Sequence, residues 1–219
     1  MYEDHYIYNP VPQGKIRFGK TEIRHIAIAL AVLTIAFTNV LAPLVDDKIQ
    51  GDIVTIYLYA LLISFVVVTA AFLTHEMAHK LIAQRQGSWA EFRMFPLGLI
   101  MAFVFSFMGL IFAAPGAVYI QGVKDSRQNG IISFAGPAVN LILGVPFMAA
   151  AFLFDIGGIL GIFIFLMGYI NIFLAFFNML PIPPLDGSKI FRWNPIIYVC
   201  ALVTSIVFVA IPFILGYPI

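Results

Sequence analysis

The sequence is poor in cysteine and in charge, and each shortage excludes a class of protein. The single cysteine, Cys200, lies in an apolar stretch, which excludes a disulfide framework and a cysteine metal site. Charged residues make up only 11% of the chain, and a net charge of +1 gives no indication of a nucleic-acid partner. We expect no cleavable signal peptide, because the apolar run that follows the polar start is too long for one.

Hydrophobic residues, in contrast, make up 62% of the 219 residues, and the mean hydropathy is +0.99. A soluble domain of this size does not need so much apolar surface, so we expect a multi-pass membrane protein. We expect a polar N-terminal segment at 1–22 and a single membrane-embedded domain at 23–219. Within that domain about five apolar runs are long enough to cross a bilayer as helices: 23–45, 53–87, 131–154, a run that ends near 180, and 196–215.

The apolar run 96–120 is a further candidate, but prolines and glycines are spaced through it. If this run crossed the bilayer, Lys124 and Arg127 would lie opposite most of the other cations. If it is a re-entrant hairpin buried against protein, possibly a β-hairpin, every lysine and arginine except Lys48 lies on one side. The positive-inside rule makes that side cytoplasmic. We therefore expect an all-α bundle of about five spans with one re-entrant segment, in the cell membrane, with the N-terminus in the cytoplasm.

The motif H-E-M-A-H at 75–79 lies in one of these apolar runs. On a helix, residues i and i+4 share a face, so His75 and His79 can bind one metal ion together. Glu76 lies beside them, within reach of a water molecule at the metal as general base. A chance match is disfavoured, because the chain has four histidines and two of them stand at ligand spacing around a glutamate. The pattern is typical of a zinc metallopeptidase. Because the motif lies near the side that carries most lysines and arginines, we expect its site to open to the cytoplasm.

A catalytic zinc ion usually takes three protein ligands and a water molecule. His5 and His25 are poor candidates for the third ligand, because one lies in the polar start and the other among basic residues at the first span. Asp186 is expected on the same side as the motif, in a stretch whose prolines forbid a regular helix. Irregular backbone at membrane depth is expected where it lines a cavity, so Asp186 is the predicted third ligand.

Three motifs together, H-E-M-A-H at 75–79, A-G-P-A-V-N at 135–140 and N-M-L-P-I-P-P-L-D-G at 178–187, resemble the site-2 protease family of intramembrane metalloproteases. The resemblance implies one zinc ion per chain, held by His75, His79 and Asp186, with Glu76 as general base. It also implies cleavage of transmembrane segments of membrane-protein substrates within the lipid bilayer, near its cytoplasmic face. Asn178 and Asn140 would then bind substrate or stabilise the oxyanion.

Other interpretations remain open at this point. Membrane zinc peptidases of the prenyl-protein-processing and heat-shock types also use H-E-x-x-H, but they carry a downstream glutamate ligand, and no glutamate follows Glu91 here. Metal transporters usually show internal repeats and several intramembrane charges, whereas one cluster stands alone here. The segment 96–120 either offers an edge to an unwound substrate or packs the core. Asn178 either contacts substrate or braces the broken helix.

Overall fold

The computed structural model describes residues 15–111, 114–154 and 156–216, so His5 and most of the polar segment 1–22 lie outside the described residues. The elements, in chain order, are α1 (Lys20–Ile49), α2 (Ile53–Val68), the π-helix η1 (Thr69–Leu73), α3 (Thr74–Arg85), β1 (Trp89–Met94), α4 (Pro96–Ser106), β2 (Gly116–Gln121), α5 (Ser126–Leu153), α6 (Gly158–Asn178), α7 (Asp186–Trp193) and α8 (Pro195–Leu215).

Five helices in the described part of the chain are long and apolar enough to cross a membrane. They are α1, the continuous rod formed by α2, η1 and α3, and then α5, α6 and α8. Their outward faces carry exposed apolar side chains such as Leu58 and Leu62 on α2 and Ile206 on α8. Since lipid can cover such faces, the fold is a polytopic helical membrane protein, which confirms the predicted fold class.

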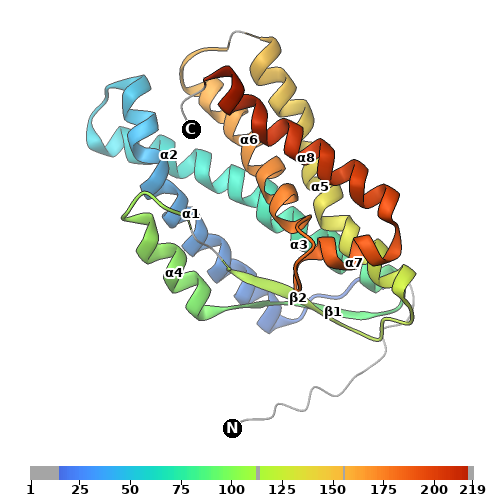
Figure 1. Cartoon of the computed structure of the whole chain (residues 1–219). Coiled ribbons are helices and arrows are strands. Elements are labelled where there is room, and N and C mark those ends of the chain that lie inside the picture. The colour runs from blue at the N-terminus through green and yellow to red at the C-terminus, as the bar shows by residue number, and fades with distance from the viewer. Residues whose placement is uncertain (1–14, 112–113, 155, 217–219) are drawn as a thin grey trace.

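The segment after β1 leaves and returns at the same end of the molecule. Helix α4 packs beside α1, and the chain then returns to β2, which pairs with β1 in an antiparallel register from Trp89 opposite Gln121 to Met94 opposite Gly116 (Figure 1). The outgoing arm is a helix rather than a strand, because Pro96 opens it and its apolar face, including Leu99, packs with Leu33 of α1. The segment is thus a mixed helix–strand hairpin.

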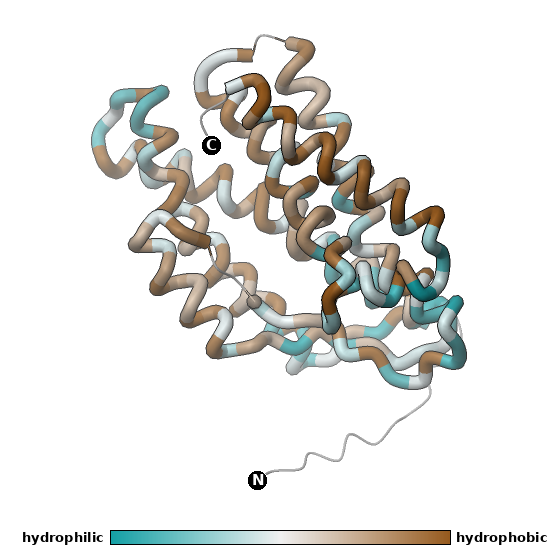
Figure 2. Tube along the Cα trace, in the orientation of Figure 1, coloured by the Kyte–Doolittle hydropathy of each residue, from teal (hydrophilic) through white to brown (hydrophobic). Residues whose placement is uncertain are grey.

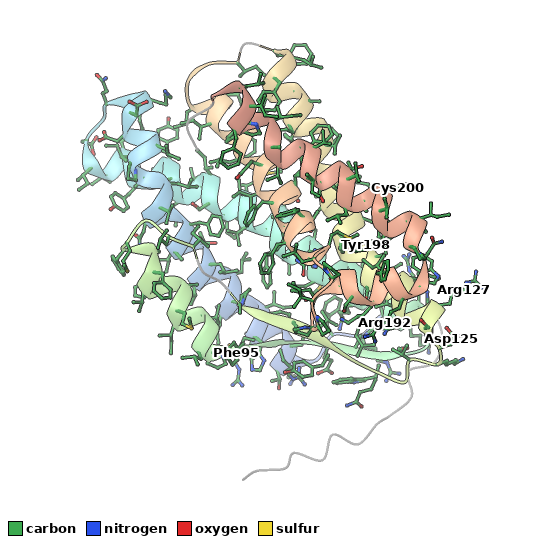
Figure 3. The ribbon with its side chains drawn as sticks, in the orientation of Figure 1. Phe95, Asp125, Arg127, Arg192, Tyr198 and Cys200 are labelled. Atoms are coloured by element: carbon green, nitrogen blue, oxygen red, sulfur yellow. The ribbon has the colours of Figure 1, made fainter. Side chains whose placement is uncertain are left out.

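The two ends of the bundle differ in their content of lysine and arginine. The α1–α2 turn lies at one end, together with the C-terminal end of α8, and β1, β2 and α7 lie at the other (Figure 1). Hydrophilic residues gather at both ends, with apolar helices between them (Figure 2). Asp125, Arg127 and Arg192 lie together where α5 begins and α7 ends (Figure 3). Apart from Lys48 at the α1–α2 turn and the buried Lys80, the described lysines and arginines belong to this second end: Lys15, Arg17, Lys20, Arg24, Arg85, Arg93, Lys124, Arg127, Lys189 and Arg192.

This arrangement makes the sidedness of the loops testable with single cysteines. In a Cys200→Ser background, which removes the exposed native thiol on α8, we expect Lys124→Cys and Arg192→Cys to react with an impermeant thiol reagent from the same side. Lys48→Cys should react only from the opposite side. Labelling of positions 48 and 124 from one side would mean that the segment 96–121 crosses the membrane.

A buried ion pair joins α1, α3 and β1. Lys80 Nζ donates to both carboxylate oxygens of Glu22, at 2.7 Å each, and to the carbonyl of Ala90 at 3.0 Å. Glu22 Oε1 also accepts the backbone N–H of Phe92 at 2.9 Å. Both charged side chains are fully buried, so loss of either one would leave the other uncompensated, at a cost of about 3–5 kcal/mol. The pair therefore anchors β1 to α3, one residue after His79.

Candidate active site

The two histidines of the motif meet on α3 as their spacing predicts. His75 and His79 are both buried, and their Nε2 atoms lie 3.0 Å apart. The preceding turn, η1, is a π-helix in which the backbone N–H of Thr74 donates to Thr69. Wider turns of this kind are frequent next to functional sites. Here the turn sets the direction in which α3 presents its histidines relative to α2.

Asp186, the first residue of α7, brings a carboxylate to the same point. Its Oδ2 lies 3.5 Å from His75 Nε2 and 3.1 Å from His79 Nε2, while its Oδ1 faces Lys189 Nζ at 3.6 Å. The stretch before it contains Pro181, Pro183 and Pro184, which prevent α6 from continuing and allow the chain to turn into α7. Burial alone would raise the pKa of the Asp186 carboxyl, but the imidazolium forms of His79 and His75 outweigh it and hold that pKa below its usual range while no metal ion is bound. Asp186 therefore stays in the carboxylate form that binds cations.

Nδ1 of each histidine, the ring nitrogen that faces away from the cluster, is hydrogen-bonded to an oxygen atom. His75 Nδ1 lies 2.6 Å from Asn140 Oδ1, and His79 Nδ1 lies 2.8 Å from the carbonyl of Ile132. Both oxygens are acceptors, so each Nδ1 carries the hydrogen and donates it. In the neutral ring, the form that binds a metal ion, each Nε2 then presents a lone pair toward the other ring and toward Asp186. Three electron-rich atoms face one another in a buried space, an arrangement that a cation between them would stabilise.

The residues present fit a zinc ion. The ligand atoms of His75, His79 and Asp186 all lie within 4.8 Å of one another, and two imidazoles with one carboxylate are a donor set of catalytic zinc sites. Gly136 of α5 packs against this point so closely that an added Cβ would overlap Nε2 of both histidines. Glycine therefore leaves open the space in which the three ligand atoms converge.

Glu76 lies beside the cluster and touches the re-entrant hairpin. Its buried carboxylate accepts the backbone N–H of Val118, in β2, at 3.1 Å. Val118 lies opposite Phe92 of β1, and the N–H of Phe92 donates to Glu22. Neither N–H of this pair therefore bonds the facing strand, and both point to the outer edges of the two-stranded sheet. The outer edge of β2 therefore runs next to Glu76.

Of the other described residues considered for the site, Asn140 contacts a predicted ligand, whereas Asn178 and His25 do not. Asn140 is fully buried, and its amide is engaged with His75, Ala71 and Asn171, so it faces the protein rather than a substrate. Asn178 is half-buried at the end of α6, where its Nδ2 donates to Leu174 of the same helix at 3.0 Å. His25 lies on α1, outside the cluster.

Asn171 was missed in the sequence, although an amide in the middle of an apolar span is a usable signal.

Comparisons with known proteins agree on one family. The model of the family described as Peptidase family M50 matches residues 155–194. "Putative zinc metalloprotease MJ0611" of Methanocaldococcus jannaschii is 38% identical over 187 residues, covering 83% of this chain and 89% of that protein. The similarly named Rip3 of Mycobacterium tuberculosis is 27% identical over 83% of this chain and 42% of its own length. YwhC of Bacillus subtilis is 31% identical over 59% of this chain and 68% of its own length. No solved structure matches the chain significantly.

Proposed function

This chain belongs to peptidase family M50, the site-2 protease family, and we propose that it is an intramembrane zinc endopeptidase that cleaves transmembrane segments of other membrane proteins. One observation carries the proposal. The ligand atoms of His75, His79 and Asp186 converge within 4.8 Å beside Glu76, on helices of a five-span apolar bundle. Family membership gives no support to a prenyl-protein-processing peptidase, a heat-shock peptidase or a metal transporter.

The chemistry follows from the groups in place. His75, His79 and Asp186 would hold one zinc ion, which when bound would polarise the scissile carbonyl and lower the pKa of the attacking water. Glu76 accepts a proton from that water and passes it to the nitrogen of the leaving amine as the C–N bond breaks. The hydrogen bond from Val118 keeps the Glu76 carboxylate next to the place where the peptide must lie.

The substrate segment must be unwound, because its peptide groups are otherwise locked in helical hydrogen bonds. In the described part of the chain the sheet has two strands, so no third strand covers the outer edge of β2. This edge supports the first of the two interpretations of segment 96–120. A substrate strand that pairs with the outer edge of β2 on either side of Val118, whose own N–H is held by Glu76, runs past Glu76. Main-chain hydrogen bonds hold such a strand without demanding a particular sequence.

The distribution of charge supports the orientation. The end of the bundle that carries β1, β2 and α7 also carries most of the described lysines and arginines. By the positive-inside rule this end, with the N-terminus and the opening of the site, faces the cytoplasm of the cell membrane. His75, His79 and Asp186 are buried, so the proposed hydrolysis requires a path by which water reaches them from this end.

Cleavage of a membrane-embedded substrate tests the proposed function. Purified protein, loaded with zinc and reconstituted in liposomes with a peptide that spans the bilayer, should release fragments whose new termini, found by mass spectrometry, map to the spanning segment. A chelator should stop the reaction and added zinc should restore it. If metal-loaded protein cleaved none of a panel of spanning peptides, or transported zinc without cleaving, the proposal would be abandoned.

Asn178 remains a candidate for substrate binding or oxyanion stabilisation. Among the described residues its side chain makes one hydrogen bond, to its own helix, which leaves the amide oxygen and one N–H for a substrate. We expect Asn178→Ala to lower the cleavage rate by about 10²-fold or more, as loss of one oxyanion donor does, while zinc content stays near normal. Thr204→Ala is a suitable control, since Thr204 also bonds the carbonyl four residues back on its own helix, α8. If Asn178→Ala instead lost zinc and also melted at a lower temperature, Asn178 would be a structural residue that braces the broken end of α6.

A further inference from the structure

A row of buried amides connects α6 and α5 to the first histidine of the cluster. Asn171 of α6 and Asn140 of α5 are both fully buried, and they lie 2.9 Å apart from Asn140 Nδ2 to Asn171 Oδ1. Asn140 meets His75 at Nδ1, the ring nitrogen that faces away from the cluster, and Asn171 lies one step further from it. Uncharged amides in the interior of a helical membrane bundle are costly unless all their hydrogen bonds are made, so their connections carry information.

The direction of the row is set by backbone carbonyls. Asn171 Nδ2 donates to the carbonyl of Met167 at 2.8 Å, so the Asn171 oxygen is the atom that faces Asn140. Asn140 Nδ2 then donates twice, to Asn171 Oδ1 and to the carbonyl of Ala71 in η1, each at 2.9 Å. Reversing the Asn140 amide would place its oxygen against two acceptors, and therefore its oxygen must face His75 Nδ1.

This orientation has a consequence at the metal side of the ring. An amide oxygen can only accept, so His75 must hold its hydrogen on Nδ1, and Nε2 is left with a lone pair. That lone pair points at the space between His79 Nε2 and Asp186 Oδ2. A ring with the hydrogen on Nε2 could not bind a metal ion from that position.

We propose that Asn171 and Asn140 form a positioning relay that holds His75 in the Nδ1–H form and thereby strengthens zinc binding. The proposal rests on the proposed function, because it takes the cluster of His75, His79 and Asp186 as the zinc site. It adds two residues that act through His75 and not on the substrate. Losing such an outer partner of a metal-binding histidine typically weakens metal affinity 10–100-fold.

A purely structural role makes a different prediction. Buried amides also join helices in membranes by hydrogen bonding, and the Asn140–Asn171 contact joins α5 to α6. In that case any substitution that breaks the contact lowers the stability of the metal-free protein, and zinc affinity does not depend on whether an acceptor remains at His75.

Two substitutions at one position separate these roles. Asn140→Asp keeps an oxygen acceptor for His75 Nδ1 but loses the donors to Ala71 and Asn171, whereas Asn140→Leu loses both. Asn171→Leu removes the next member of the row. Asn39→Leu makes the same change at a half-buried amide of α1 that bonds Ser106, away from the cluster, and serves as control. For each full-length variant the zinc Kd is measured by competition with a chelator, and the melting temperature is measured without metal.

The relay predicts that Asn140→Leu weakens zinc binding about 10–100-fold, which is a loss of about 1.4–2.8 kcal/mol. Asn140→Asp should stay within about threefold of the wild type although its metal-free melting temperature falls. Asn171→Leu should weaken binding about threefold to tenfold, and Asn39→Leu should not change it.

Equal loss of affinity in Asn140→Asp and Asn140→Leu, or a Kd within threefold of the wild type in Asn140→Leu, would overturn the relay and leave the proposed function standing. If Asn140→Leu does not fold, Asn140→Asp and Asn171→Leu decide, and an unchanged Kd in Asn171→Leu rejects the relay. Wild-type protein that binds no zinc would overturn the proposed function and the relay together.

Discussion

Replacing Glu76 with glutamine is expected to leave the zinc content and the fold unchanged while cleavage falls by about 10²–10⁴-fold. Glutamine has the shape of glutamate and keeps an oxygen that can accept the N–H of Val118, so the hairpin stays in place. What it lacks is a lone pair basic enough to take a proton from water. The measurements are the cleavage rate of a spanning peptide, the zinc content and the melting temperature.

Glu91→Gln is the matched control for this substitution. Glu91 is the same residue type on β1, close to the site in the fold, but it pairs with Arg93 and does not belong to the metal cluster. Its replacement should leave the cleavage rate within a few-fold of the wild type. Glu76→Gln protein that retained a tenth or more of wild-type activity would show that another group accepts the proton.

Replacing any of the three predicted ligands with alanine is expected to have the largest effect, loss of both zinc and activity. Asp186→Ala removes the only carboxylate in the cluster, and the two imidazoles that remain make an incomplete shell. His75→Ala and His79→Ala should behave alike. Metal content after dialysis against a buffered zinc concentration, measured with the cleavage rate, gives the result directly.

Asp125→Ala separates ligand loss from a general effect of removing an aspartate. Asp125 caps α5 through the N–H of Gln128, so its loss should cost about 1 kcal/mol of stability and no zinc. Asp186→Ala protein with full zinc occupancy and activity would show that the third ligand lies elsewhere in the chain.

Much of the fold was predictable from patterns that act locally. Length and apolar content identified the spans, and the lysine and arginine distribution indicated that the segment 96–120 turns back. Helical periodicity placed His75 and His79 on one face, and the prolines before Asp186 indicated irregular backbone. Each of these signals depends on residues that are neighbours in sequence or on a sum over a whole loop.

The contacts that the sequence did not reveal join residues far apart in the chain. Glu22 was read as part of a polar start, yet it is fully buried because Lys80, on another helix, neutralises it. Asn140 was expected at the substrate, but its partners Ala71 and Asn171 come from two other elements. The helical form of α4 depends on packing against α1. Pairings of this kind are decided by tertiary structure, which a single sequence does not report.

The position of the two histidines depends on the number of residues in the π-turn η1, and not only on which residues they are. One residue more or fewer in this turn would rotate α3 by about 100° relative to α2. The two histidines would then leave Gly136 and Asp186, although every apolar residue of the rod was kept. Ala71, whose carbonyl holds Asn140, would turn away as well. Exchanges among apolar residues at 69–73 should therefore be far better tolerated than a single insertion or deletion there, so relatives with this site should keep this segment's length more strictly than its residues.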